Sequence, residues 1–242
     1  MAQLEVMISG GFQGPYTAML PEFQKSTGIT VTTKSGASQG SGPKTIKAQL
    51  ATGVTADIVI MSREGLAELV AAGKIIPGTD VDLAQAPLGL AVPAGSPKPD
   101  ISTTSSFKES LIKAKLIAVP GSTSGIYLTK EVFPQLGLTK QITVTVTERG
   151  SQATTLLAAK EVNVAVQPSS ELINVDGIIV PTQTGFYRYR QMRAIDNGLG
   201  QANHQIDVFQ NSGSCAFANY FLYGTAKINI DYVRIYGRHN FR

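Results

Sequence analysis

Cysteine, clustered metal ligands and long apolar runs are missing or scarce in this 242-residue chain, and each absence excludes a class of protein. The single cysteine, Cys215, rules out an intramolecular disulfide and a cysteine-based metal cluster. No apolar run reaches about eighteen residues, so the sequence predicts no insertion into a membrane. No cluster of His, Asp and Cys occurs, so we expect no metal ion and no cofactor.

Motifs of nucleotide-binding proteins and serine hydrolases are also absent. Segment 40–45 reads GSGPKT, which has the wrong spacing for a P-loop, and no dinucleotide-binding fingerprint is present. His204 and His239 lie near the C-terminus, and no Gly-x-Ser-x-Gly elbow occurs. The sequence therefore gives weak support to an enzyme.

The net charge of +4 is mild and unevenly placed. Residues 1–187 carry 14 basic and 14 acidic side chains, whereas residues 188–242 carry 7 and 3. A neutral body argues against a nucleic-acid surface, so we expect no nucleic-acid partner.

Short β-rich runs alternate with helical stretches up to about residue 181, a pattern typical of βαβ units on a mostly parallel sheet. The expected strands are 3–9, 28–34, 56–61, 87–93, 115–119, 141–147, 162–166 and 177–181. The expected helices are 15–25, 43–52, 64–73, 104–113, 124–136 and 151–160. The sequence therefore predicts an α/β fold.

Two segments divide this pattern into two lobes. A loop rich in Pro, Gly and Asp at 77–87 is the first expected crossing, and a return crossing is expected near 181–187. Lobe one is then 1–84 plus 183–242, and lobe two is 85–182. The last 62 residues hold 11 of the 17 aromatic residues, and strand-like runs occur there at 217–223 and 227–236. We expect extra strands or an extension in this C-terminal segment.

Three loops rich in Gly and Ser each follow an expected strand and lead into an expected helix. Backbone N–H groups and hydroxyls at a helix N-terminus suit an anion, although plain helix capping explains each loop taken alone. In an open α/β sheet such loops lie at the carboxyl ends of the strands, where ligands bind. The candidate ligand-binding residues of these loops are Ser9, Gly10, Gly11, Ser38, Gln39, Ser122, Ser124 and Gly125.

Further candidates follow two later strands. Gln167 and Ser169 come directly after the run at 162–166, where a serine could instead cap a short helix. Ser151 begins the expected helix 151–160 and is read first as part of its cap and second as an anion contact.

Basic side chains near these loops have two interpretations. Lys44 and Lys47 lie on one face of a helix beside the second loop and could attract a multiply charged acid. Arg188, Arg190 and Arg193 form a similar cluster. A solvated surface remains the alternative for both groups.

The order of motifs in residues 1–181 resembles the type II periplasmic solute-binding proteins of the molybdate-binding kind. The resemblance rests on the first strand ending in Ser9-Gly10-Gly11 and on motifs that follow it in order. These motifs are SGAS at 35–38, ADIVI at 56–60, AGKI at 72–75, LGLAV at 88–92, KPDI at 98–101 and SGIY at 124–127.

The resemblance implies two doubly wound lobes with a central cleft and a two-strand hinge. It implies an oxyanion held by Ser9 and Ser38 from lobe one, and by Ser124 with Gln167 or Ser169 from lobe two. The family usually has a Tyr where this chain reads Gln167-Pro168-Ser169, which leaves the identity of the anion open. The C-terminal segment also departs from the helices with which the family ends.

Two functions are compatible with this resemblance. The leading one is a receptor that captures a small oxyanion or a di- or tricarboxylate for the membrane subunits of an ABC importer. The alternative is an isomerase, because a branch of the family is similar to aconitate isomerase, which moves a proton on a tricarboxylic acid. We expect a monomer in the periplasm, as a mature form without its signal peptide, with the cytoplasm as the alternative.

Overall fold

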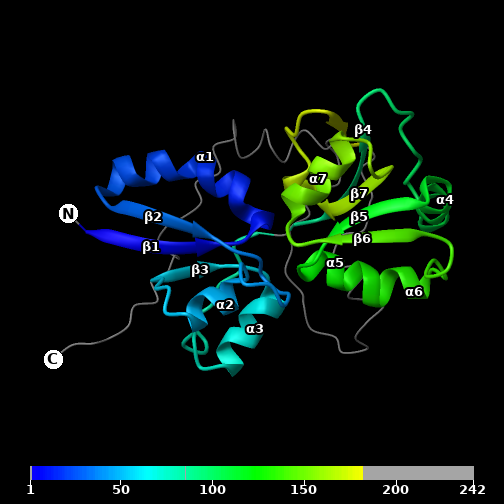
Figure 1. Cartoon of the computed structure of the whole chain (residues 1–242). Coiled ribbons are helices and arrows are strands. Elements are labelled where there is room, and N and C mark those ends of the chain that lie inside the picture. The colour runs from blue at the N-terminus through cyan, green and yellow to red at the C-terminus, as the bar shows by residue number, and fades with distance from the viewer. Residues whose placement is uncertain (1, 85, 182–242) are drawn as a thin grey trace.

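The computed structural model describes residues 2–84 and 86–181, which form an α/β protein with two separate sheets (Figure 1). A sheet of three strands and its helices come first in the chain, and we call this part the first lobe. A sheet of five strands and its helices follow, and we call this part the second lobe. The described chain passes between the lobes in the segment that joins α3 to β4.

The first lobe is a parallel sheet in the order β2-β1-β3, with helices on both faces (Figure 1). Helix α1 covers one face, and α2 and α3 cover the other. Met7, Ile46 and Leu69 are fully buried and form its core. The elements are β1 (Gln3–Ile8), α1 (Gly10–Thr27), β2 (Thr30–Ser35), α2 (Ile46–Ala51), β3 (Ile58–Ile60) and α3 (Arg63–Ala71).

The second lobe is a mixed sheet in the order β6-β5-β7-β4-β8. Strand β5 runs parallel to β6 and β7, whereas β4 is antiparallel to β7 and β8. Its strands are β4 (Leu88–Pro93), β5 (Leu116–Pro120), β6 (Thr143–Thr147), β7 (Val164–Pro168) and β8 (Ile178–Ile179). Its helices are α4 (Thr104–Ala114), α5 (Thr123–Tyr127), the π-helical turn η1 (Leu128–Val132), α6 (Phe133–Gln135), α7 (Gly150–Ala158) and the 3₁₀ turn η2 (Ser169–Glu171).

Local sequence explains these elements. Strands β4 and β7 are buried along their whole length, which matches their nearly continuous apolar runs. In α4 the apolar Phe107 and Leu111 lie on one face and are buried. The helix begins with a capping box in which Thr103 and Ser106 satisfy each other's backbone N–H groups.

The expected α/β fold is confirmed, and each of the eight strands expected up to residue 181 occurs where the sequence places it. The start predicted for the first helix is wrong, because α1 begins at Gly10 rather than near residue 15. Glycine is a poor helix former, so the sequence predicts a loop at Gly10 and Gly11. The residue limits of the two lobes and the two-strand hinge remain predictions, since the segment from 182 onward lies outside the described residues. The same holds for the strands expected at 217–223 and 227–236.

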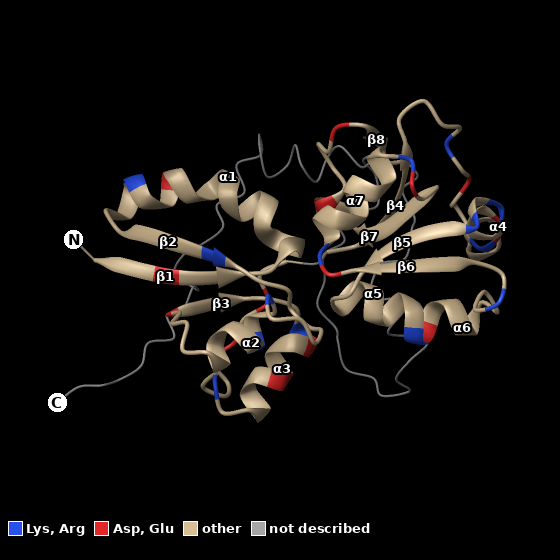
Figure 2. Cartoon of the chain, viewed as in Figure 1, with Lys and Arg blue, Asp and Glu red and all other residues tan. Residues whose placement is uncertain are grey.

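Charges of both signs are interspersed over the two lobes (Figure 2). Among the described residues, no group of three or more His, Cys, Asp or Glu side chains is placed to hold a metal ion. Of the helices in the described part of the chain, none combines the length and the apolar character that crossing a membrane requires.

Candidate functional site

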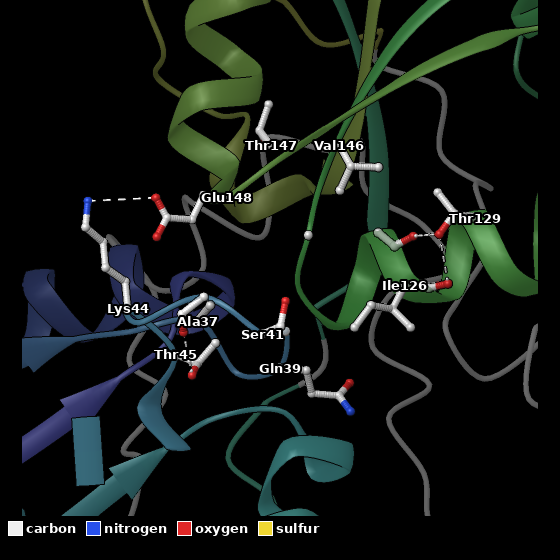
Figure 3. Close-up of a pocket in the computed structure, with 14 residues that line it drawn as sticks. Ala37, Gln39, Ser41, Lys44, Thr45, Ile126, Thr129, Val146, Thr147 and Glu148 are labelled. Carbon is white, nitrogen blue, oxygen red and sulfur yellow. Dashed lines mark hydrogen bonds and ion pairs between the residues drawn. The ribbon is translucent and has the colours of Figure 1, made fainter. Parts of the chain in front are cut away.

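A cavity of about 420 Å³ lies between the two lobes (Figure 3). The loop between β2 and α2 lines it from the first lobe, and the start of α5 and the end of β6 line it from the second. At its rim the Lys44 Nζ lies 3.9 Å from the Glu148 Oε2, so an ion pair joins the lobes there. Both side chains are substantially exposed, so this pair contributes little stability.

The lobes also meet through backbone and hydroxyl groups beside the cavity. The hydroxyls of Ser62 and Thr123 share a hydrogen bond of 2.7 Å. A Cβ atom on Gly40 would lie only 2.7 Å from the carbonyl oxygen of Gly121, so these two loops meet through their backbones. Gly40 has a φ of +119°, which also favours glycine at this position.

The serines predicted from the resemblance are buried at this interface. Ser9, Ser38 and Ser124 are 9%, 8% and 7% exposed. Ser38 Oγ accepts a hydrogen bond of 3.0 Å from the backbone N–H of Ser62, which ties its loop to the end of β3. Ser9 occupies the N-cap position of α1 but makes no side-chain cap bond. Simple helix capping therefore does not explain Ser9.

The side-chain amide of Gln39 already donates a hydrogen bond to another side chain, which weakens its assignment as a ligand-binding group. Its Nε2 donates to Glu68 Oε1 at 2.6 Å, and Lys47 Nζ lies 3.3 Å from the other carboxylate oxygen. The hydrogen bond from Gln39 and the bond and charge of Lys47 lower the pKa of Glu68. Lys47 thus has an acidic partner, while Gln39 still lines the cavity.

The remaining candidates lie around this interface in different settings. Gly125 lines the cavity, and Ser122 is the N-cap residue of α5 without a side-chain cap bond. Ser151 is exposed in the first turn of α7. Ser169 does not cap η2 with its side chain; instead its Oγ packs against Gly89. The capping role considered for residue 169 is therefore wrong.

On the other side of the interface, one carboxyl group lies between two helix N-termini. Gly10 and Gly150 are the first residues of α1 and α7. A Cβ atom on Gly10 would lie 2.7 Å from the carboxyl carbon of Glu171, and one on Gly150 would lie 2.3 Å from its Oε2. Glycine at both positions therefore leaves room for the Glu171 carboxyl group. Ser170 Oγ donates to the carbonyl oxygen of Gly11 at 2.7 Å and holds η2 against α1.

Burial and the side chains of Arg149 and Gln167 define the environment of the Glu171 carboxyl group. Burial raises the pKa of Glu171 to about 7, and the positive charge of Arg149 lowers it by a smaller amount. Arg149 itself reaches the first lobe, where its Nη2 donates to Ser35 Oγ at 3.3 Å. Gln167 is fully buried, and its Nε2 donates to the backbone carbonyl of Glu171 at 3.3 Å, while its Oε1 has no hydrogen-bond partner in the described part of the protein. An acid that titrates near neutral pH thus lies at the interface of the lobes.

Sequence reasoning missed Glu171 and Arg149. The search for anion ligands selected hydroxyls, amides and glycines, and an acidic residue did not fit that criterion. The available signal was position, because Glu171 follows Ser169-Ser170 directly and Arg149 directly precedes Gly150.

Two α/β lobes that enclose a cavity between strand-to-helix loops define the class of two-lobed ligand-binding proteins. The chain belongs to the bacterial extracellular solute-binding protein family, whose model matches residues 4–198. This confirms the family resemblance seen in the sequence.

One relative of the chain is an enzyme, and solved structures with a similar fold include binding proteins. The chain is 35% identical over 185 residues to the aconitate isomerase of a Pseudomonas species, a match that spans 74% of this chain and 71% of that enzyme. Its fold is similar to the sulfate-binding protein SubI of Mycobacterium tuberculosis H37Rv, with a TM-score of 0.55, 19% identity, and coverage of 74% and 70% of the two chains. It is also similar to the periplasmic molybdate-binding protein of Azotobacter vinelandii, with a TM-score of 0.52, 18% identity, and coverage of 72% and 74%.

Proposed function

We propose that this protein captures a small carboxylate or oxyanion in the cleft between its lobes. The observation that carries the proposal is the meeting of two helix N-termini, those of α1 and α7, at the interface of the lobes. The N-cap Ser9 of α1 makes no cap bond, and the start of α7 at Gly150 lies beside the buried amide of Gln167. The first N–H groups of a helix have no intrahelical acceptors and favour an anion.

The cavity on the other side of the interface is large enough for an organic acid as well as for a tetrahedral oxyanion. Its volume of about 420 Å³ falls within the usual range of small-molecule sites, about 300–1,000 Å³. The aconitate isomerase relative favours a tricarboxylate, and the family assignment supports a binding role. We propose that the protein acts as a monomer in the periplasm and delivers its ligand to the membrane subunits of an ABC importer.

A thermal-shift screen tests the binding function. The probes are cis- and trans-aconitate, citrate, sulfate, phosphate, molybdate and tungstate, because a ligand at 100 times its Kd stabilises the fold by about 2.7 kcal/mol. The expected result is a higher melting temperature with at least one carboxylate. Replacing Ser124 by Ala should reduce the shift, whereas the matched change of the exposed Ser26 should not. No shift with any probe would rule out the proposed function.

A second candidate function, isomerisation of a tricarboxylate, is favoured by Glu171. Such a reaction needs a group that accepts and returns a proton, and a carboxyl group with a pKa of about 7 is suited to this at neutral pH. Incubation with trans-aconitate in deuterated water, followed by proton NMR, tests this function. Protein-dependent exchange or conversion to cis-aconitate would establish the isomerase, and tight binding without either would leave the binding protein.

A further inference from the structure

Two oxygen acceptors lie beside Gly150 at the interface of the lobes. Glu171 places its carboxyl group against Gly150, and Gln167 Oε1 lies 3.1 Å from the Cβ position of the same glycine. The amide nitrogen of Gln167 is turned toward the backbone carbonyl of Glu171, so its oxygen is the atom left over. An ionised carboxylate only accepts hydrogen bonds, whereas a protonated one also donates.

Apart from the partial positive charges of the two helix N-termini, few charged groups act on Glu171. Within the described residues, Arg149 is the charged group that acts on it, and its effect is smaller than that of burial. Helix α1 contributes Gly10, α7 contributes Gly150 and β7 contributes Gln167, none of which carries a charge. A second negative charge brought into this site would repel an ionised Glu171 and favour its protonated form.

We propose that an anion enters this site together with one proton, and that Glu171 carries that proton. The proton comes from solvent and adds to a carboxylate oxygen of Glu171, so the site gains one proton for each anion bound. No bond to the ligand forms or breaks. The inference rests on the proposed function, since it concerns the same anion in the same cleft, and it makes the site a receptor for an anion and a proton at once.

The geometry explains why this residue carries the proton. The carboxyl group of a dissolved carboxylic acid ionises near pH 4–5, about as an unperturbed Glu does, so a bound carboxylate takes up a proton less readily than Glu171. Burial has already raised the pKa of Glu171 to about 7, so a proton is available to it near neutral pH. Protonated Glu171 then donates to the ligand or to Gln167 Oε1, which satisfies one of the two acceptors.

Isothermal titration calorimetry of the full chain tests the inference. The ligands are trans-aconitate and sulfate, because the charge of both anions is constant from pH 6 to 9. For the wild type the Kd should increase about tenfold for each pH unit above 7, or about 100-fold between pH 6 and pH 9. Titration at pH 8 in buffers of different ionisation enthalpy should give an uptake of about one proton for each anion. The neutral variant Glu171→Gln should bind with a Kd that does not depend on pH and should take up no proton.

The matched control is Glu161→Gln, which removes an exposed carboxylate from the segment between α7 and β7 and should keep the wild-type pH dependence. Anion binding by the wild type without proton uptake at pH 8 would overturn the inference and leave the proposed function standing. This result needs no variant, so it decides the matter even where Glu171→Gln does not fold. Proton uptake that persists in a folded Glu171→Gln variant would equally assign the proton to another group. If neither probe nor any other anion of the thermal-shift screen binds the wild type, the proposed function fails and this inference fails with it.

Discussion

Replacing Glu171 by Gln should make the free protein more stable above neutral pH. The pKa of this carboxyl group is raised from 4.5 to about 7 because folding buries it. Between these two pH values the folded state holds more protons than the unfolded state, so the free energy of unfolding of the wild type falls as the pH rises. The glutamine variant has no such group and escapes this loss.

The size of the effect follows from the two pKa values. At about 1.4 kcal/mol for each pH unit, the rise from 4.5 to about 7 corresponds to about 3 kcal/mol of lost stability at pH 8. For a domain of this size, this equals an increase in melting temperature of about 6–12 °C for Glu171→Gln. Below pH 4.5 the carboxyl group is protonated in both states, so the two proteins should melt at the same temperature apart from the effect of the amide itself.

Urea unfolding and thermal melts of both proteins at pH 4.5, 6, 7 and 8 measure this difference. Glu161→Gln, which removes an exposed carboxylate, should follow the wild type at every pH. If the stability of Glu171→Gln and of the wild type changes with pH in the same way, ionisation of the Glu171 carboxyl group does not destabilise the fold. The reasoning about its burial would then be wrong.

Three other substitutions probe the loops of the site. Gly10→Ala would bring a Cβ atom to 2.7 Å from the carboxyl carbon of Glu171. Since this carboxyl group is the end of a side chain, it should move to solvent at little cost. The melting temperature of the variant should then depend less on pH than that of the wild type. Gly125→Ala would place a Cβ atom 1.6 Å from the carbonyl oxygen of Pro120, a backbone atom, so urea unfolding should show a loss of about 3 kcal/mol or more, and a wild-type midpoint would contradict the geometry. Ser38→Ala removes a buried hydroxyl beside the cavity and should weaken anion binding by about 1.5–3 kcal/mol in calorimetry, whereas unchanged binding would reduce the serine to holding its loop.

Much of the fold could be predicted because its signals are local. Each strand up to residue 181 is a short β-rich run that the local sequence marks, and the buried face of α4 follows directly from the spacing of Phe107 and Leu111. The start of α1 could not be predicted in this way. Its first turn contains Gly10 and Gly11, which disfavour a helix, and contact with Ser170 of the other lobe compensates for them.

The candidate site could be predicted only in part. Ser9, Ser38 and Ser124 were found because hydroxyls before helices have a recognisable spacing, and the structure buries them at the interface. The role of Glu171 depends on Gly10 and Gly150, which are distant from it in the sequence and meet it only in the folded protein. A local pattern contains no information on such a contact, or on the burial that changes its pKa.

The backbone contact between Gly40 and Gly121 sets a fixed minimum distance between the lobes at the cavity. Because no side chain lies between these two loops, rotamer changes cannot shorten that distance. Ligands of different size that fit the cavity would therefore meet the same limit on how closely the lobes can approach at this point.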